Sequence, residues 1–169
     1  AEVHGRIDRI GALGGADEVV RLGIAVQELM KYAGMDTDHI AIRTSYYHGI
    51  DATHSQVQVH NLGYLLENLN YEDSVLIVDD VFDRGRSIEA IIAELTRLTR
   101  RNLPKDIRIA TVWFKPEKNV TDLTPHYYVN ETSRWLVFPH ELDGLSAEEV
   151  GTGKPTIADI VARALEVAS

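Results

Sequence analysis

The residues best suited to chemistry lie in the segment VLIVDDVFDRGRS, residues 75–87. Two adjacent carboxylates, Asp79 and Asp80, follow a continuous apolar run, residues 75–78. A tight turn into a predicted helix comes next, and its residues are Asp83, Arg84, Gly85, Arg86 and Ser87. Amides at the start of a helix favour an anion, and a glycine permits close approach of a phosphate that a side chain would block. Paired acids beside a phosphate cradle fit ribose 5-phosphate, with the acids on the diol or on a sugar-bound metal.

Paired acids alone are a weak signal, because many strands end in Asp-Asp without forming a site. Receiver-type signalling domains also place paired acids after an apolar strand. They need a phospho-accepting Asp and a later Lys, and they have no phosphate turn directly after the pair. The turn at residues 83–87 therefore favours a sugar phosphate over a receiver-like module.

The elements that position this segment follow from the hydrophobic pattern. Residues 75–78 are apolar without interruption, which predicts a strand covered on both faces in a parallel sheet. Helices are predicted at 17–33, 62–69 and 88–98, and a last helix is predicted to begin at a capping box, residues 156–159, and to end at about 167. Strands are predicted at 40–47, 57–59, 107–114, 127–129 and 135–138. This alternation predicts an α/β domain, and such sheets bind ligands at the carboxyl ends of their strands.

Composition limits the class of protein. The 169 residues predict a single domain, 1–169, and the net charge of -9 argues against nucleic acid as a partner. The absence of cysteine excludes disulfides, thiolate zinc sites and Cys nucleophiles, and it fits a cytoplasmic location. We expect no association with a membrane, because no apolar run approaches the ~18 residues of a membrane span and the amino terminus has no signal-peptide pattern.

The segment at residues 75–87 resembles the phosphoribosyl-pyrophosphate signature of the type I phosphoribosyltransferases. The resemblance implies a mostly parallel twisted sheet flanked by helices, with a small hood over the carboxyl ends of the strands. It implies that Asp79 and Asp80 bind the ribose hydroxyls, directly or through Mg²⁺, and that residues 83–87 bind the 5′-phosphate. The family usually has a small hydroxylated residue where this chain has Arg84, so the side-chain contact at that position stays open.

The carboxyl-terminal half resembles the 6-oxopurine branch of the family, whose substrates are hypoxanthine, guanine or xanthine. The resemblance implies that Lys115 donates to the purine 6-oxygen and that Trp135 stacks on the base. It also implies that the backbone of Leu136 contacts the edge around purine position 2 and that Glu141 helps to hold magnesium and pyrophosphate. Residues 115–142 would then contribute to the base-binding hood.

Two amino-terminal features have alternative interpretations. Ser45-Tyr46 resembles the Ser-Tyr pair of the family's mobile loop, and it is equally consistent with an ordinary strand end. Leu13-Gly14-Gly15 resembles the loop that binds pyrophosphate through its backbone, although Leu13 stands where the family has a basic residue. In a second alignment that loop is missing before Gly23.

The resemblance implies displacement of pyrophosphate from ribose carbon 1 by a purine ring nitrogen, through an oxocarbenium-like state. Asp83 is the candidate to accept the departing proton of the purine. The expected partners are phosphoribosyl pyrophosphate and a purine base, in a homo-oligomer that is a dimer or a tetramer. The alternative function is a non-catalytic regulator that binds phosphoribosyl pyrophosphate on the same fold.

Overall fold

The computed structural model describes residues 9–13, 17–47, 56–136, 138, 142 and 145–168. It divides the chain into two compact units, 1–133 and 134–169, and each is considered by itself. The single domain expected from the sequence stays a prediction. None of the helices among the described residues is long and apolar enough to cross a membrane.

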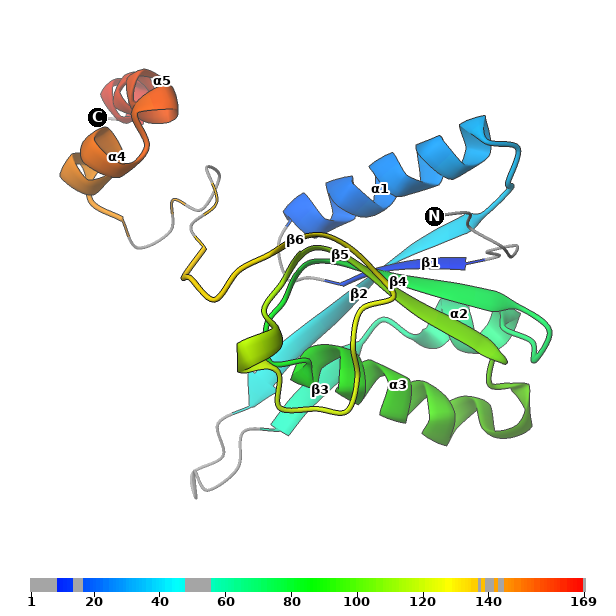
Figure 1. Ribbon diagram of the computed structural model, residues 1–169. Helices are drawn as coiled ribbons and strands as arrows, with labels where there is room; N and C mark the ends of the chain where they lie inside the picture. The colour runs from blue at the N-terminus through cyan, green and yellow to red at the C-terminus, as the bar shows by residue number, and fades with distance from the viewer. Residues whose placement is uncertain are drawn as a thin grey trace. The chain divides into compact units, whose positions relative to one another are not determined.

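The first unit is built on a six-stranded sheet in the order β3-β2-β1-β4-β5-β6. The strands are β1 (Arg9–Leu13), β2 (Asp38–Tyr47), β3 (Gln56–His60), β4 (Ser74–Phe82), β5 (Asp106–Phe114) and β6 (Tyr127–Glu131). Only the β2–β3 pair is antiparallel. Helix α1 (Asp17–Tyr32) covers one face, and α2 (Gly63–Asn68) and α3 (Arg86–Thr99) cover the other (Figure 1). The predicted α/β architecture with a mostly parallel sheet is confirmed.

Strand β4 is buried on both faces, which explains its uninterrupted apolar run. Val75 and Ile77 belong to the core beneath α2 and α3, whereas Leu76 and Val78 belong to the core beneath α1. All four side chains are at most 3% exposed. Packing on both sides fixes the direction of the strand, and the two acids come next within it, before its last residues Val81 and Phe82.

Helix α3 follows β4 after a turn of three residues. Its apolar positions Ile88, Ile91 and Leu95 are at most 1% exposed, so the predicted amphipathic helix is confirmed with two residues added at its start. Gly85 occupies the N-cap position with φ of 77°, in the left-handed region. The 3-10 helix η1 (Arg100–Asn102) follows α3.

Two sequence expectations in the second unit are wrong. A capping box that the sequence pattern did not predict lies at Ser146 and Glu149, at the start of α4 (Ala147–Gly153), and the last helix does not begin at Thr156 as expected. Helix α5 (Pro155–Ala168) starts at Pro155, because proline suits the first helical position, which places Thr156 inside the first turn. The expected strand at 135–138 is absent from its described residues, and the Phe138 carbonyl accepts a hydrogen bond from the Lys154 ammonium.

Gly85 is a position where the fold requires glycine. A Cβ atom there would lie 2.5 Å from the Thr121 hydroxyl and 2.9 Å from the Phe82 ring. We therefore expect Gly85→Ala to lower the free energy of unfolding by about 2–5 kcal/mol, from left-handed backbone strain and overpacking together. Urea unfolding measures this change.

Gly63→Ala is the matched control, because no atom of the described residues lies within 4 Å of a Cβ at Gly63 in helix α2. This substitution should raise the free energy of unfolding by about 0.4–1 kcal/mol, because alanine reduces the conformational entropy of the unfolded chain. Equal unfolding free energies for Gly85→Ala and the wild type would contradict the packing around the turn.

Candidate functional site

A cavity of about 220 Å³ lies at the carboxyl end of β4, between the turn and the first turn of α3. Its lining residues are Asp79, Val81, Phe82, Asp83, Arg84, Gly85, Arg86, Ser87 and Ile88. The structure therefore brings the predicted phosphate-binding residues and one of the paired acids together around one cavity. Asp80 is not among the lining residues.

The two acids are held by the backbone that follows them. Asp79 Oδ1 accepts from the Asp80 amide at 3.0 Å, and Asp80 Oδ1 accepts from the Val81 amide at 2.7 Å. Burial, and then the neighbouring charge of Asp80, raise the pKa of Asp79 well above its ordinary value. An ionised Asp79 is therefore costly in the ligand-free protein, and a cation at this position would offset that cost.

Lys115 reaches the phosphate turn from the adjacent strand. Its amide donates to the Phe82 carbonyl at 2.9 Å, and its ammonium Nζ lies 3.5 Å from Asp83 Oδ2. The Lys115 side chain is only 7% exposed, and Asp83 Oδ1 is buried with no hydrogen-bond partner among the described residues. The sequence predicts that Lys115 donates to the purine 6-oxygen and that Asp83 accepts the purine proton. In the structure the buried Lys115 ammonium lies against the Asp83 carboxylate, next to the cavity.

The turn is also supported by residues that sequence analysis did not identify. The Val120 amide donates to the Arg84 carbonyl at 3.3 Å, and the side chains of Asn119 and Thr121 lie against Gly85. This corrects one expectation, because a side chain at Gly85 would first meet the protein's own chain and not the space of a phosphate. The pattern Asn-x-Thr after Lys115 is typical of a side-chain-stabilised turn and was the available signal.

Leu13, the first residue of the expected pyrophosphate loop, is the last residue of β1. Ala12 pairs with Val78, so β1 ends at Leu13 beside the position of Asp79. Gly14 and Gly15, which complete the proposed pyrophosphate loop, lie outside the described residues.

Ser45 and Tyr46 belong to β2 and pair with Gln58 and Val57 of β3, as the strand interpretation predicts. The Ser45 hydroxyl lies 3.0 Å from His60 Nε2. Their role in a loop that closes over a ligand stays a prediction.

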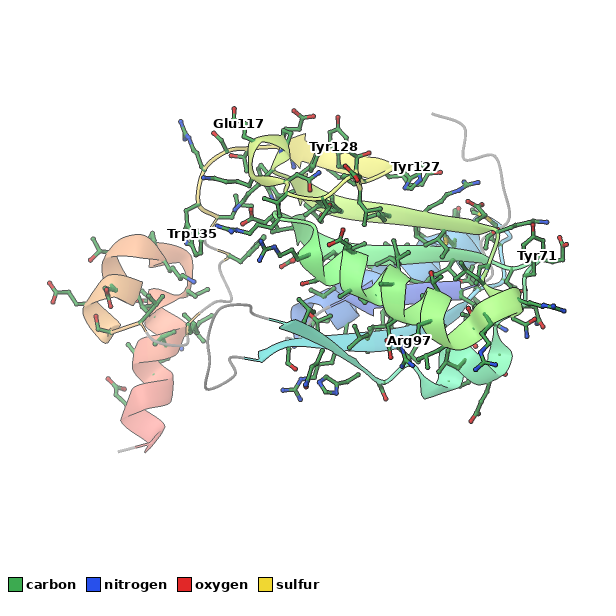
Figure 2. The ribbon with its side chains drawn as sticks, turned by 90° about the horizontal axis from the view of Figure 1, so that it is seen from below. Tyr71, Arg97, Glu117, Tyr127, Tyr128 and Trp135 are labelled. Carbon is green, nitrogen blue, oxygen red and sulfur yellow. The ribbon has the colours of Figure 1, made fainter. Side chains whose placement is uncertain are left out.

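The base-binding residues expected beyond β6 belong to the second unit. The side chain of Trp135, labelled in Figure 2, is 83% exposed. Leu136 is partly buried. Glu141 lies outside the described residues. The roles of these three residues stay predictions.

No group of three or more His, Asp or Glu among the described residues could enclose a metal ion by itself. Mg²⁺ commonly uses only one or two carboxylates and completes its shell with substrate phosphates and water. The paired acids near the carboxyl end of β4 suit this mode of binding, because Asp79 borders the cavity and burial raises the pKa of its carboxyl. Asp79 and Asp80 therefore fit a magnesium ion that arrives with an anionic substrate.

The raised pKa of Asp79 makes a prediction about stability. The folded state retains a proton on Asp79 above about pH 3.9, where the unfolded chain releases it. Stability therefore falls as pH rises through the folded-state pKa. Asp79→Asn should raise the Tm of the ligand-free protein at pH 8, by about 2–4 °C for each kcal/mol relieved, and the gain should shrink towards pH 4.

Thermal unfolding at pH 8 and pH 4 measures this effect. Glu117→Gln is the control, because Glu117 is an exposed carboxyl in the 3-10 helix η2 (Pro116–Lys118) (Figure 2). A gain for Asp79→Asn that is the same at both pH values would show that charge burial is not its cause.

Comparisons with known proteins agree with this geometry. A purine phosphoribosyltransferase from Pyrococcus horikoshii OT3 is 27% identical, with a TM-score of 0.57 over 83% of this chain and 81% of that chain. A hypoxanthine phosphoribosyltransferase from Staphylococcus aureus is 22% identical, with a TM-score of 0.53 over 76% of this chain and 63% of that one. A hypothetical protein from Neisseria gonorrhoeae, with bound ppGpp, is 19% identical, with a TM-score of 0.61 over 90% of this chain and 83% of that one.

The last two similarities show the fold alone. None of the curated proteins matches this chain. The model of the phosphoribosyl transferase domain matches residues 19–144, which include strand β4, the phosphate turn and Lys115. With more than half of its residues matched and the corresponding sheet and turn in place, this protein belongs to the phosphoribosyltransferase family.

Proposed function

We propose that the protein transfers the 5-phosphoribosyl group of phosphoribosyl pyrophosphate to a 6-oxopurine, giving a nucleoside monophosphate and pyrophosphate. The observation that carries this proposal is the Lys115–Asp83 contact of 3.5 Å beside the phosphate turn. It supplies a hydrogen-bond donor and a proton acceptor next to each other, as a purine with a 6-oxygen and an ionisable ring nitrogen requires. The 27% identity to a purine phosphoribosyltransferase supports the same substrate class.

The phosphate turn binds the 5′-phosphate in this proposal. The first turn of a helix leaves amides without partners inside the helix, and α3 begins at Arg86. Arg84 and Arg86 are exposed at the cavity and add positive charge to a chain of net charge -9. The helix dipole favours the phosphate dianion at the same end of α3.

The ribose lies towards the paired acids. Asp79 and Asp80 bind its hydroxyls, and Mg²⁺, when bound with the substrate, neutralises charge on the pyrophosphate leaving group. As the bond from carbon 1 to pyrophosphate breaks, the sugar ring becomes cationic, and carboxylates close to the ring stabilise it. The purine ring nitrogen forms the new bond to carbon 1, and Asp83 accepts the proton that the purine releases.

Lys115 selects the base. An ammonium group only donates hydrogen bonds, so it pairs with a 6-oxygen and not with a 6-amino group. In the substrate-free protein the Asp83 carboxylate lies 3.5 Å from this buried cation, and the purine oxygen would be a further acceptor for the ammonium. Trp135 supplies stacking and Leu136 a backbone contact to the base, as the family resemblance implies.

A turnover assay with labelled hypoxanthine, guanine, xanthine and adenine tests the proposal. Formation of a monophosphate from an oxopurine, faster than from adenine, supports it. Binding of phosphoribosyl pyrophosphate without turnover of any base would identify a non-catalytic regulator instead. Light scattering in the same buffer tests the proposed dimer or tetramer.

Replacing Lys115 tests the choice of base. Lys115→Met should lower kcat/KM for hypoxanthine roughly 10- to 150-fold. This corresponds to a loss of about 1.5–3 kcal/mol of transition-state stabilisation, the range for a hydrogen bond to a charged group. The preference for hypoxanthine over adenine should narrow. Because Lys115 also faces Asp83, the measurement is the hypoxanthine-to-adenine ratio, which damage to Asp83 alone would not change.

Trp135→Ala is the comparison variant, because stacking is available to every purine. It should weaken all bases together and leave the ratio unchanged. A wild type that prefers adenine, or a Lys115→Met variant with an intact preference for oxopurines, would exclude Lys115 as the specificity residue.

The second functional prediction concerns the metal. Excess chelator should abolish turnover, and added Mg²⁺ should restore it, because an acidic chain must bind a highly anionic substrate. Initial rates across a magnesium titration measure this dependence. Full turnover without any divalent ion would remove Asp79 and Asp80 from the metal-linked role.

A further inference from the structure

The chain between β5 and β6, residues 115–126, lies against the phosphate turn. We refer to it as the β5–β6 connection. One backbone hydrogen bond joins it to the turn, because the Val120 amide donates to the Arg84 carbonyl at 3.3 Å. A second joins it to the last residue of β4, because the Lys115 amide donates to the Phe82 carbonyl at 2.9 Å. The segment that carries the proposed base-recognising lysine is therefore also bonded to the proposed phosphate site.

Two side chains determine the shape of this connection. Asn119 Nδ2 donates to the Leu123 carbonyl at 2.7 Å, and Asn119 Oδ1 accepts from the amide and the hydroxyl of Thr121, at 3.0 and 2.9 Å. The Leu123 amide in turn donates to Thr121 Oγ1 at 3.3 Å. These bonds all lie within residues 119–123, where they take the place of a regular backbone ladder.

Two oxygen atoms of this network, Thr121 Oγ1 and Asn119 Oδ1, lie close to Gly85. A Cβ built there would be 2.5 Å from Thr121 Oγ1 and 3.0 Å from Asn119 Oδ1. Neither Asn119 nor Thr121 lines the cavity, so neither is placed to touch a ligand in it. Their effect on a bound phosphate must pass through the turn.

The orientation of the Arg84–Gly85 peptide would connect Asn119 and Thr121 to the binding of a phosphate. Its carbonyl accepts from the Val120 amide, and because a trans peptide is planar, the Gly85 N–H points in the opposite direction, away from the connection. If the connection moved away, this peptide could rotate and turn its carbonyl towards the anion. A carbonyl oxygen in place of an N–H would repel phosphate.

We propose that Asn119 and Thr121 are positioning residues that hold the Arg84–Gly85 peptide in the orientation that binds the 5′-phosphate. This inference rests on the proposed function, because it assigns support to the phosphate site of that reaction. It separates two effects on kinetics. Loss of the network weakens binding of phosphoribosyl pyrophosphate, and it leaves binding of the purine unchanged, since Lys115 keeps its own backbone bond to Phe82.

Thr121→Val tests the proposal, because it removes the hydroxyl and keeps the shape. We expect KM for phosphoribosyl pyrophosphate to rise about tenfold, equivalent to about 1.4 kcal/mol, with KM for the purine and kcat unchanged. Kd for ribose 5-phosphate, measured by calorimetry, should rise by the same factor. Thr121→Ser retains the hydroxyl and should restore wild-type values.

Thr124→Val is the matched control, since Thr124 is an exposed residue of the same connection. It should leave every kinetic constant unchanged. Asn119→Asp gives a second, isosteric variant that keeps the acceptor for Thr121, loses the donor to Leu123 and should also raise KM for phosphoribosyl pyrophosphate.

The outcomes separate this inference from the proposed function. A wild type that neither binds nor turns over phosphoribosyl pyrophosphate overturns the function itself. A wild type that does both, with Thr121→Val showing only a lower Tm, overturns the inference alone. Equal increases in KM for both substrates, or a lower kcat at unchanged KM, would likewise indicate a purely structural role.

Discussion

Strand β4 is packed from both sides, and this burial is the constraint on which the candidate site depends. Val75 and Ile77 contact the core under α2 and α3, and Leu76 and Val78 contact the core under α1. A strand held by two close-packed layers cannot shift its end without opening a cavity in one of them. Asp79 is therefore held in β4 beside the carboxyl end of β1, and the phosphate turn leaves the sheet after Phe82 in a fixed direction.

Several buried ionisable groups lie at this end of the sheet, where burial makes their charged forms unfavourable in the ligand-free protein. Burial and Asp80 raise the pKa of Asp79, and Lys115 is a buried cation with Asp83 at 3.5 Å. Within the part of the chain that the structure describes, one buried oxygen of Asp83 has no hydrogen-bond partner. Groups arranged at such a cost are typical of sites whose interactions are completed by a ligand, and here the ligand would supply a cation, a 6-oxygen and a proton donor.

The β5–β6 connection relates the two halves of the proposed site. It begins at Lys115, which faces Asp83, and reaches Gly85 through Asn119 and Thr121. Sequence separation hides this relation, because Gly85 and Thr121 belong to different strand-to-strand crossovers. Their contact exists only because β4 and β5 are parallel neighbours whose following segments leave the same edge of the sheet.

The sequence alone predicted the α/β class, the buried strand at 75–78 and the grouping of residues 83–87, because each depends on local pattern. Hydrophobic periodicity and a contiguous motif can be recognised in the sequence without knowing which distant residues they contact. It failed at 135–138 and at the last capping box, where a short apolar run and a Thr-x-x-Asp pattern each predicted structure. Strand formation needs a partner, and the start of a helix depends on the residues that precede it.

Tertiary structure alone decided the contacts that give the site its chemistry. Lys115 and Asp83 are separated by a helix and a strand in the sequence, and only the pairing of β4 with β5 brings them to 3.5 Å. The same pairing places Thr121 on Gly85, so that the glycine serves the protein's own packing. Local residue types determine which groups are available. Which of them meet depends on the order of strands in the sheet, and that order follows from burying the apolar faces of the whole chain at once.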